Sequence, residues 1–218
     1  MKKSMKKALY TASFLSAAIL SSNAMAQANV ANVTSSVTVN NSITAALGNT
    51  GLNFGVVALV PGVDGSAGGE SDEDMGATAT VSSGGVLSAA AIETGADGTD
   101  VQAVASVVDD TNAQAALINL SDAVDTSTLN VTIDNVSVPT SGFNTLALDG
   151  FLTSYNGGTE SAPRDLSSGS VSFTETFSSS FGGGTNTLSI GATITAAEGD
   201  TINETAPYTG SFDVTVSY

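Results

Sequence analysis

The closing stretch of the chain, residues 208–218, constrains the fold more than any other segment. Large apolar or aromatic residues alternate there with small polar ones. The apolar register contains Tyr208, Phe212, Val214, Val216 and Tyr218, with Gly210 completing the series. Strict alternation with a period of two is typical of a strand with one buried and one solvated face. We therefore predict that the chain ends in a strand paired into a sheet, and that the fold is all-β.

Short strand-like segments recur between turn signals along the rest of the chain. They cover residues 30–47, 52–60, 77–83, 101–108, 129–138, 143–155, 171–177 and 188–194. Residues 111–120 fit either a short helix, because alanine favours helix, or another strand, because their apolar residues alternate. About nine short strands with turns at this spacing, and no long helix, predict an antiparallel β-sandwich formed by residues 27–218 as a single domain.

The order of residues predicts two further details of these strands. Residues 52–60 form a nearly continuous apolar run, which is typical of a strand covered on both faces. Residues 129–138 alternate cleanly and are followed by Pro139, which is expected to end that strand because proline cannot donate to the sheet ladder. Between residues 86 and 125 the alternation weakens, so the order of the strands there is left open.

The N-terminus carries the pattern of a secretory leader. Four lysines, at positions 2, 3, 6 and 7, precede an apolar run over residues 8–20, and Ala24-Met25-Ala26 follows. This pattern predicts a signal peptide over residues 1–26 that is cleaved before Gln27. An uncleaved membrane anchor is the alternative, but the run is too short and too rich in Ser and Thr for a comfortable span. We therefore expect an exported protein of the periplasm, the cell surface or the extracellular medium, with no stable membrane span after cleavage.

The charge of the chain excludes several classes of partner. The sequence has 5 Lys and Arg against 21 Asp and Glu, and cleavage before Gln27 leaves Arg164 as the only strong base, with a net charge of −20. Nucleic acid is not an expected partner, because phosphate binding needs Lys and Arg. Anionic lipid surfaces are disfavoured by the same charge. We interpret the negative charge as a means of colloidal solubility, because repulsion between like-charged molecules keeps an abundant exported protein soluble.

Residue types that common catalytic centres require are absent. The chain has no His and no Cys, which excludes Ser-His-Asp and Cys-His nucleophile systems and ordinary zinc sites. Paired carboxylates are the remaining route to hydrolysis, and Glu175 and Asp213 are acids in strand-like segments. The register of Asp213 points it to solvent, whereas Glu175 shares the register of Phe173 and points inward or lies at a rim, with Arg164 as its only available strong base. We therefore predict no catalytic residues and no enzyme activity.

An acidic, glycine-rich loop spans residues 64–76. Its carboxylates are Asp64, Glu70, Asp72, Glu73 and Asp74. Clustered carboxylates suit Ca²⁺, so these residues are the candidate metal ligands and calcium is the one cofactor considered. Their spacing is not that of an EF-hand loop, and charge runs are usually solvated. A solvated loop is therefore the favoured interpretation, and no cofactor is predicted.

Two short motifs lie far apart in the sequence. The first is Leu52-Asn-Phe-Gly55, and the second joins Gly191-Ala-Thr-Ile-Thr-Ala to the closing stretch, residues 208–218. These motifs resemble a family of exported bacterial proteins, the domain of unknown function 4402. Together they frame essentially the whole mature chain, whereas residues 86–125 depart from the family pattern and look like an insertion or a divergent pair of hairpins. The resemblance implies an immunoglobulin-like or pilin-like sandwich on the outside of a Gram-negative cell, and it implies no catalytic residues.

Two hypotheses of function follow. The first is a non-enzymatic structural or surface protein, a component of a fimbria-like or extracellular matrix assembly, whose partners are copies of itself or other surface proteins. In such an assembly residues 30–47 could add as a strand to a neighbour's open sheet edge, although pairing within their own sheet is the favoured arrangement. The second is a calcium-dependent adhesive or ligand-binding β-sandwich that uses the acidic loop at residues 64–76.

Overall fold

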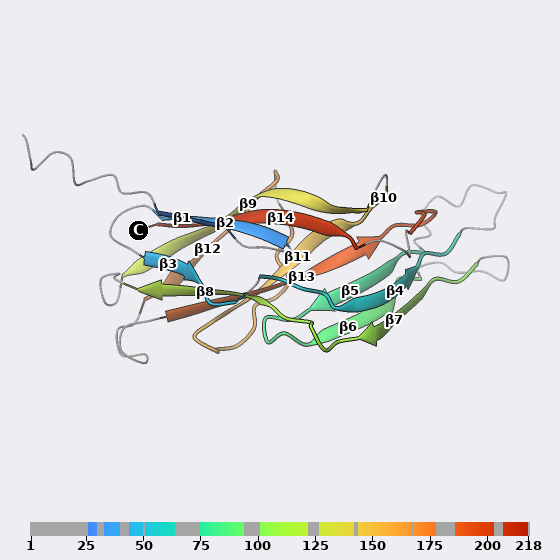
Figure 1. Cartoon of the computed structure of the whole chain (residues 1–218), viewed down its shortest axis with the longest axis horizontal. Helices are drawn as coiled ribbons and strands as arrows, with labels where there is room; N and C mark the ends of the chain where they lie inside the picture. The colour runs from blue at the N-terminus through green and yellow to red at the C-terminus, as the bar shows by residue number, and fades with distance from the viewer. Residues whose placement is uncertain are drawn as a thin grey trace, which may run out of the picture.

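The described residues form an all-β fold, as the alternating segments predicted (Figure 1). The computed structural model describes residues 26–29, 33–39, 44–49, 51–63, 75–93, 101–121, 127–141, 144–166, 168–177, 186–202 and 207–217. These residues contain fourteen strands and no helix, and the longer strands are close in number to those predicted. No helix with the length and hydrophobicity of a membrane crossing occurs in the described ranges.

The first sheet joins the two ends of the described chain. Its strands are β1 (Ala26–Asn29), β2 (Val33–Val39), β14 (Thr209–Ser217), β9 (Thr128–Ser141), β10 (Asn144–Thr145) and β12 (Val171–Thr176). Their order is β1-β2-β14-β9-β10, and β12 also pairs with β9. β14 thus lies between β2 and β9, which confirms that the closing stretch is paired into a sheet. One pair departs from the antiparallel pattern, because β2 runs parallel to β14.

The second sheet is organised around β13. Its strands are β3 (Thr44–Leu47), β8 (Ala116–Ser121), β13 (Asn186–Ala196), β5 (Ala77–Val81), β6 (Leu87–Ala91) and β11 (Ala147–Tyr155). On one side of β13, the first half pairs with β8 and the second half pairs with β5. β11 also pairs with β13, along most of the length of β13. The segment that fitted either a helix or a strand, residues 111–120, therefore contributes the strand β8.

A separate two-stranded antiparallel sheet completes the structure. It consists of β4 (Val56–Val60) and β7 (Val104–Asp109), and we call it the β4–β7 ribbon. Figure 1 shows it beside β5 and β6, at the lower right of the molecule. The region that departed from the family pattern, residues 86–125, therefore supplies one strand of this ribbon and two strands of the second sheet, β6 and β8.

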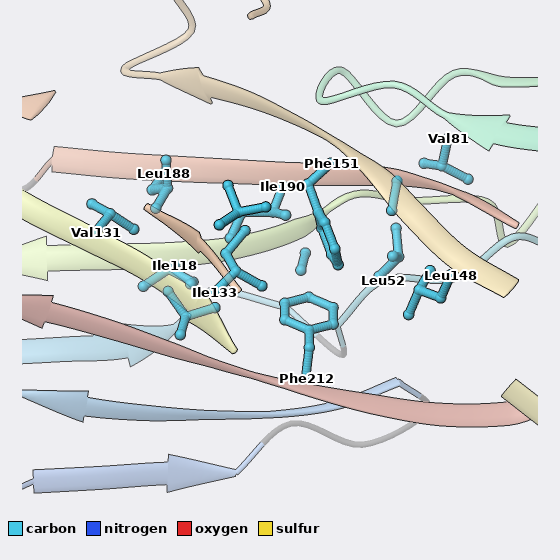
Figure 2. Packing of buried hydrophobic residues seen from close by; sticks show 14 of the residues in the cluster. Leu52, Val81, Ile118, Val131, Ile133, Leu148, Phe151, Leu188, Ile190 and Phe212 are labelled. Atoms are coloured by element: carbon cyan, nitrogen blue, oxygen red, sulfur yellow. The ribbon is translucent and has the colours of Figure 1, made fainter. Parts of the chain in front are cut away.

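One hydrophobic core lies between the two large sheets (Figure 2). Side chains that the first sheet contributes with no exposed area are Leu129, Val131, Ile133, Phe212, Val214 and Val216. Those that the second sheet contributes include Val81, Ile118, Leu120, Phe151, Leu188 and Ile190. The rings of Phe151 and Phe212 point toward each other across the core, with centroids 5.5 Å apart and ring planes at 71°. Because these two rings come from different sheets, their contact confirms the predicted sandwich.

The opening alternating segment divides between the two sheets. Residues 30–47 were predicted as an opening strand, and their described parts form β2 in the first sheet and β3 in the second. Val33 of β2 lies opposite Gly210 of β14, and Val39 lies opposite Val216. The favoured prediction, that this segment pairs within its own sheet, is therefore confirmed for β2.

The prediction that Pro139 ends its strand is wrong. β9 continues through Pro139 to Ser141. The register between β9 and β14 shifts around this position, with Thr209 opposite Thr140 and Ser211 opposite Ser137. A bulge leaves a residue outside the regular ladder, so the missing N–H of proline costs no ladder hydrogen bond there.

The prediction that residues 52–60 are covered on both faces is also wrong. Leu59 is 5% exposed and packs into the core, but Val56 and Val60 are 52% and 51% exposed. β4 pairs with β7 and not with a central strand of either large sheet. One face of this apolar run therefore lies on the surface.

Candidate functional site

The predicted calcium ligands lie outside the described residues. Asp64, Glu70, Asp72, Glu73 and Asp74 all fall between Val63 and Met75, where the description is interrupted. In the ranges that the structure describes, no group of three or more Asp, Glu, His or Cys side chains is arranged to hold a metal ion. The calcium hypothesis therefore stays a prediction from the sequence.

Glu175 lies on β12 in the register of buried residues. Val171 and Phe173 are 6% and 8% exposed, whereas Ser172 and Thr174 between them are exposed. Glu175 itself is partly buried, which agrees with the inward or rim position predicted from its register. Among the described strands β12 pairs only with β9, so Glu175 lies on an edge strand of the first sheet.

Arg164 lies beside the same strand. Its backbone pairs with Phe151 of β11, since each of the two N–H groups donates to the carbonyl oxygen of the other residue, at 2.9 and 3.0 Å. Its guanidinium carbon lies 4.6 Å from the ring centroid of Phe173, which is a cation–π contact. Its Nε is buried and has no hydrogen-bond partner in the described structure. This base, the only Lys or Arg in the described ranges, is thus held by an aromatic ring.

Glu175 interacts electrostatically with both Arg164 and Tyr155. Burial raises the pKa of Glu175, and the positive charge of Arg164 offsets part of that rise. Burial, and then the negative charge of Glu175, raise the pKa of Tyr155 to about 12. The Tyr155 hydroxyl donates to Oδ1 of Asn186 at 2.5 Å, and Nδ2 of Asn156 donates to the same oxygen at 2.7 Å. Tyr155 therefore stays protonated at neutral pH, and its hydroxyl joins β11 to the first residue of β13.

We expect Glu175→Gln to raise stability at pH 7, measured by the midpoint of urea unfolding. The pKa of Glu175 in the fold is raised above its ordinary value of 4.5. The stability that protonated Glu175 contributes is therefore fully present below the pKa of this residue in the unfolded chain. It is lost as the pH rises through the pKa of Glu175 in the folded chain. Glutamine does not ionise, so the variant gains over the parent at pH 7, and the two converge below pH 4.5.

The change in net charge needs its own control in this comparison. Asp110→Asn removes one negative charge from an exposed residue outside the core, and it shows how much net charge alone contributes. If Glu175→Gln is less stable than the parent at pH 7, attraction between Glu175 and Arg164 outweighs the effect of burial, and the interpretation of this cluster is wrong.

Asp213 lies on the opposite face of the first sheet from Glu175. The neighbouring Phe212 is fully buried, so Asp213 points outward, as its register predicted. It lies opposite Asp134 of β9, and its Oδ2 accepts a hydrogen bond from Nδ2 of Asn135 at 3.0 Å. Burial, and then the charge of Asp213, raise the pKa of Asp134. Glu175 and Asp213 thus point to opposite sides of the sheet, so the structure does not bring them together as a hydrolytic pair.

One surface feature was not predicted from the sequence. Nine large hydrophobic side chains are exposed in the described ranges. Seven of them lie on the β4–β7 ribbon or on the bridge that extends it: Val56, Val60, Val63, Val101, Val104, Val107 and Val108. The sequence signal was an apolar run in both registers of residues 56–60. Such a run is typical of a strand buried on both sides, and periodicity alone does not show that one side is open.

Comparisons with protein-family models, with curated proteins and with solved structures found no match to the chain. The resemblance to the domain of unknown function 4402 therefore stays a prediction from its two motifs. In the structure Leu52 of the first motif is buried, and Asn53 pairs with Gln114 through backbone hydrogen bonds of 2.9 Å. The second motif contributes the end of β13 and the whole of β14, which are central strands of the two large sheets.

Proposed function

We propose that the chain is an exported, non-enzymatic structural or surface protein, a component of a fimbria-like or extracellular matrix assembly. The leader pattern over residues 1–26 supports export. The observation that carries the proposal is the gathering of exposed valines on the β4–β7 ribbon. Contiguous apolar patches on a soluble protein mark interaction sites, whereas scattered exposed residues do not. The resemblance to the domain of unknown function 4402 supports the same class of function.

The arrangement of β2 bears on how such an assembly is built. Within this chain β2 already occupies the edge of β14, with β1 outside it. A chain that begins at residue 40 would lack both strands and would leave that edge of β14 open. An unpaired edge strand is a template for pairing with another chain. The shortened chain therefore separates assembly through strand addition from assembly through the folded surface.

The test is expression of the full sequence in a Gram-negative bacterium, followed by cell fractionation and N-terminal sequencing. We expect the protein outside the cytoplasm, with Gln27 as its first residue and with protease sensitivity on intact cells. Immunogold electron microscopy of the cells is then expected to show the protein within ordered polymers or sheets on the outer surface. A protein that keeps Met1 and stays in the cytoplasm contradicts the proposal. The chain that begins at residue 40 is imaged alongside, and equal assembly by both forms excludes strand exchange through β2.

A further inference from the structure

The outer side of the β4–β7 ribbon carries four exposed valines, and we call them the valine face. They are Val56, Val60, Val104 and Val108, exposed to 52, 51, 55 and 64%. Val60 and Val104 lie directly opposite each other in the antiparallel register. The inner side of the same ribbon is the one that packs, since Leu59 and Ala105 contact the core.

Two other outer faces of this protein carry hydroxyl residues in the equivalent positions, whereas on the ribbon only Ser106, opposite Ala58, does. In β5 the residues between the buried ones are Thr78 and Thr80, and in β12 they are Ser172 and Thr174. Threonine is β-branched and fits a strand as well as valine does. The chain could therefore build the ribbon with hydroxyl side chains, as it does elsewhere. Four exposed valines in one place point instead to a surface that another molecule covers.

The charges around the valine face indicate what covers it. Asp109 ends β7 and Asp110 follows it, and both are exposed. At the other end of β7 the side-chain amide of Gln102 lies 2.7 Å from the carboxylate of Glu93. Acids therefore lie toward both ends of β7. The only base in the described ranges, Arg164, is held against Phe173 of β12.

A second copy of the chain fits this surface poorly. It would bring the same acids against these acids, and in the mature chain its net charge of −20 would repel this one. A partner with positive charge around an apolar centre matches both properties of the surface. Charge complementarity of this kind speeds encounter and excludes partners of the wrong sign.

We propose that the valine face binds a polypeptide segment of another protein that is apolar at its centre and carries Lys or Arg at both ends. This inference specifies a partner for the surface protein proposed above. It rests on the proposed function in one respect, namely that the protein acts by binding other molecules at its surface. The valines supply the contact, because burying apolar area is the main favourable term in association. The acids toward the ends of β7 require that the partner carries positive charge. Binding therefore weakens as salt screens those charges.

The test uses two labelled synthetic peptides and the mature chain, residues 27–218, in fluorescence anisotropy. One peptide is Lys-Lys-Val-Thr-Val-Thr-Val-Lys-Lys, and the other has glutamate in place of each lysine. We expect the basic peptide to bind and the acidic one not to bind. The double variant Val60→Ser and Val104→Ser, which leaves every charge in place, is expected to lose at least tenfold in affinity for the basic peptide. Val56→Ser with Val108→Ser is a second variant of the same face and is expected to lose affinity similarly.

The matched control is Val86→Ser with Val138→Ser, two valines exposed to 67 and 43% that lie off the ribbon. We expect this control to bind like the parent. Urea unfolding of all variants shows that each is folded. Equal binding of the basic peptide by parent and valine-face variants overturns the proposal, because charge alone would then explain it. Dimerisation in sedimentation experiments that only the valine-face substitutions abolish also overturns it, in favour of a second copy. These outcomes leave the test of export and assembly unaffected.

Discussion

Replacing Phe212 with alanine is expected to lower the free energy of unfolding by about 3–5 kcal/mol, the usual cost of truncating a buried aromatic residue. Phe212 has no exposed area and lies on β14, between β2 and β9 of the first sheet. Its ring meets Phe151 of the second sheet, so truncation opens a cavity where the two sheets touch. For a domain of this size the melting temperature should fall by roughly 10 °C.

The expected loss is checked by urea and thermal unfolding, with Phe212→Leu as the graded comparison. Leucine keeps most of the apolar volume, so it should lose clearly less stability than alanine does. Tyr208→Ala removes an aromatic ring that lies just before β14 and is only partly buried, and it should have a smaller effect. If the free energy of unfolding of Phe212→Ala lies within about 1 kcal/mol of that of the parent, Phe212 does not lie in a packed core.

Gly191→Ala is expected to cost about 3 kcal/mol, because the added methyl group has no room. A Cβ at Gly191 would lie 2.1 Å from the carbonyl oxygen of Val81 and 2.6 Å from the carbonyl carbon of Ser82. Both contacts are backbone atoms, which cannot rotate away as a side chain does. Gly191 lies in β13 between Ile190, which pairs with β8, and Ala192, which pairs with β5. The substitution therefore strains the point where β13 changes partner.

Gly84→Ala provides the matched control for this substitution. Gly84 is exposed in the turn that follows β5, and the nearest atom to an added Cβ is 3.6 Å away. Its replacement should change the unfolding free energy by no more than about 0.5 kcal/mol. Equal midpoints for the Gly191 and Gly84 variants would show that β5 and β13 do not approach each other as described.

Some of the fold could be predicted from the sequence because its physical cause is local. Phe212, Val214 and Val216 alternate with Ser211 and Asp213. This alternation specifies a strand with one buried face, whichever strands it pairs with. The same reasoning placed Glu175 in the register of buried residues. Partner choice, in contrast, depends on contacts between distant segments. The parallel pairing of β2 with β14 and the division of residues 30–47 between two sheets leave no periodic signal.

The candidate site could not be predicted for a related physical reason. Val56 to Val60 is apolar in both registers, and such a run satisfies a central strand as well as an edge ribbon. Only the topology, in which β4 pairs with β7 instead of joining a large sheet, leaves Val56 and Val60 on the surface. Pro139 was misread similarly, because the register shift that accommodates it exists only where β9 pairs with β14, a long-range pairing that alternation along β9 does not show.

Two sheets that share one core must be coupled energetically through the side chains that meet between them. A double-mutant cycle on Phe151 and Phe212 measures that coupling directly, from the unfolding free energies of the parent, the two alanine variants and the double variant. Rings in edge-to-face contact across the core are expected to give a coupling of about 0.5–1.5 kcal/mol. Strictly additive losses would mean that the two rings do not touch, and would contradict a sandwich in which β11 and β14 face each other.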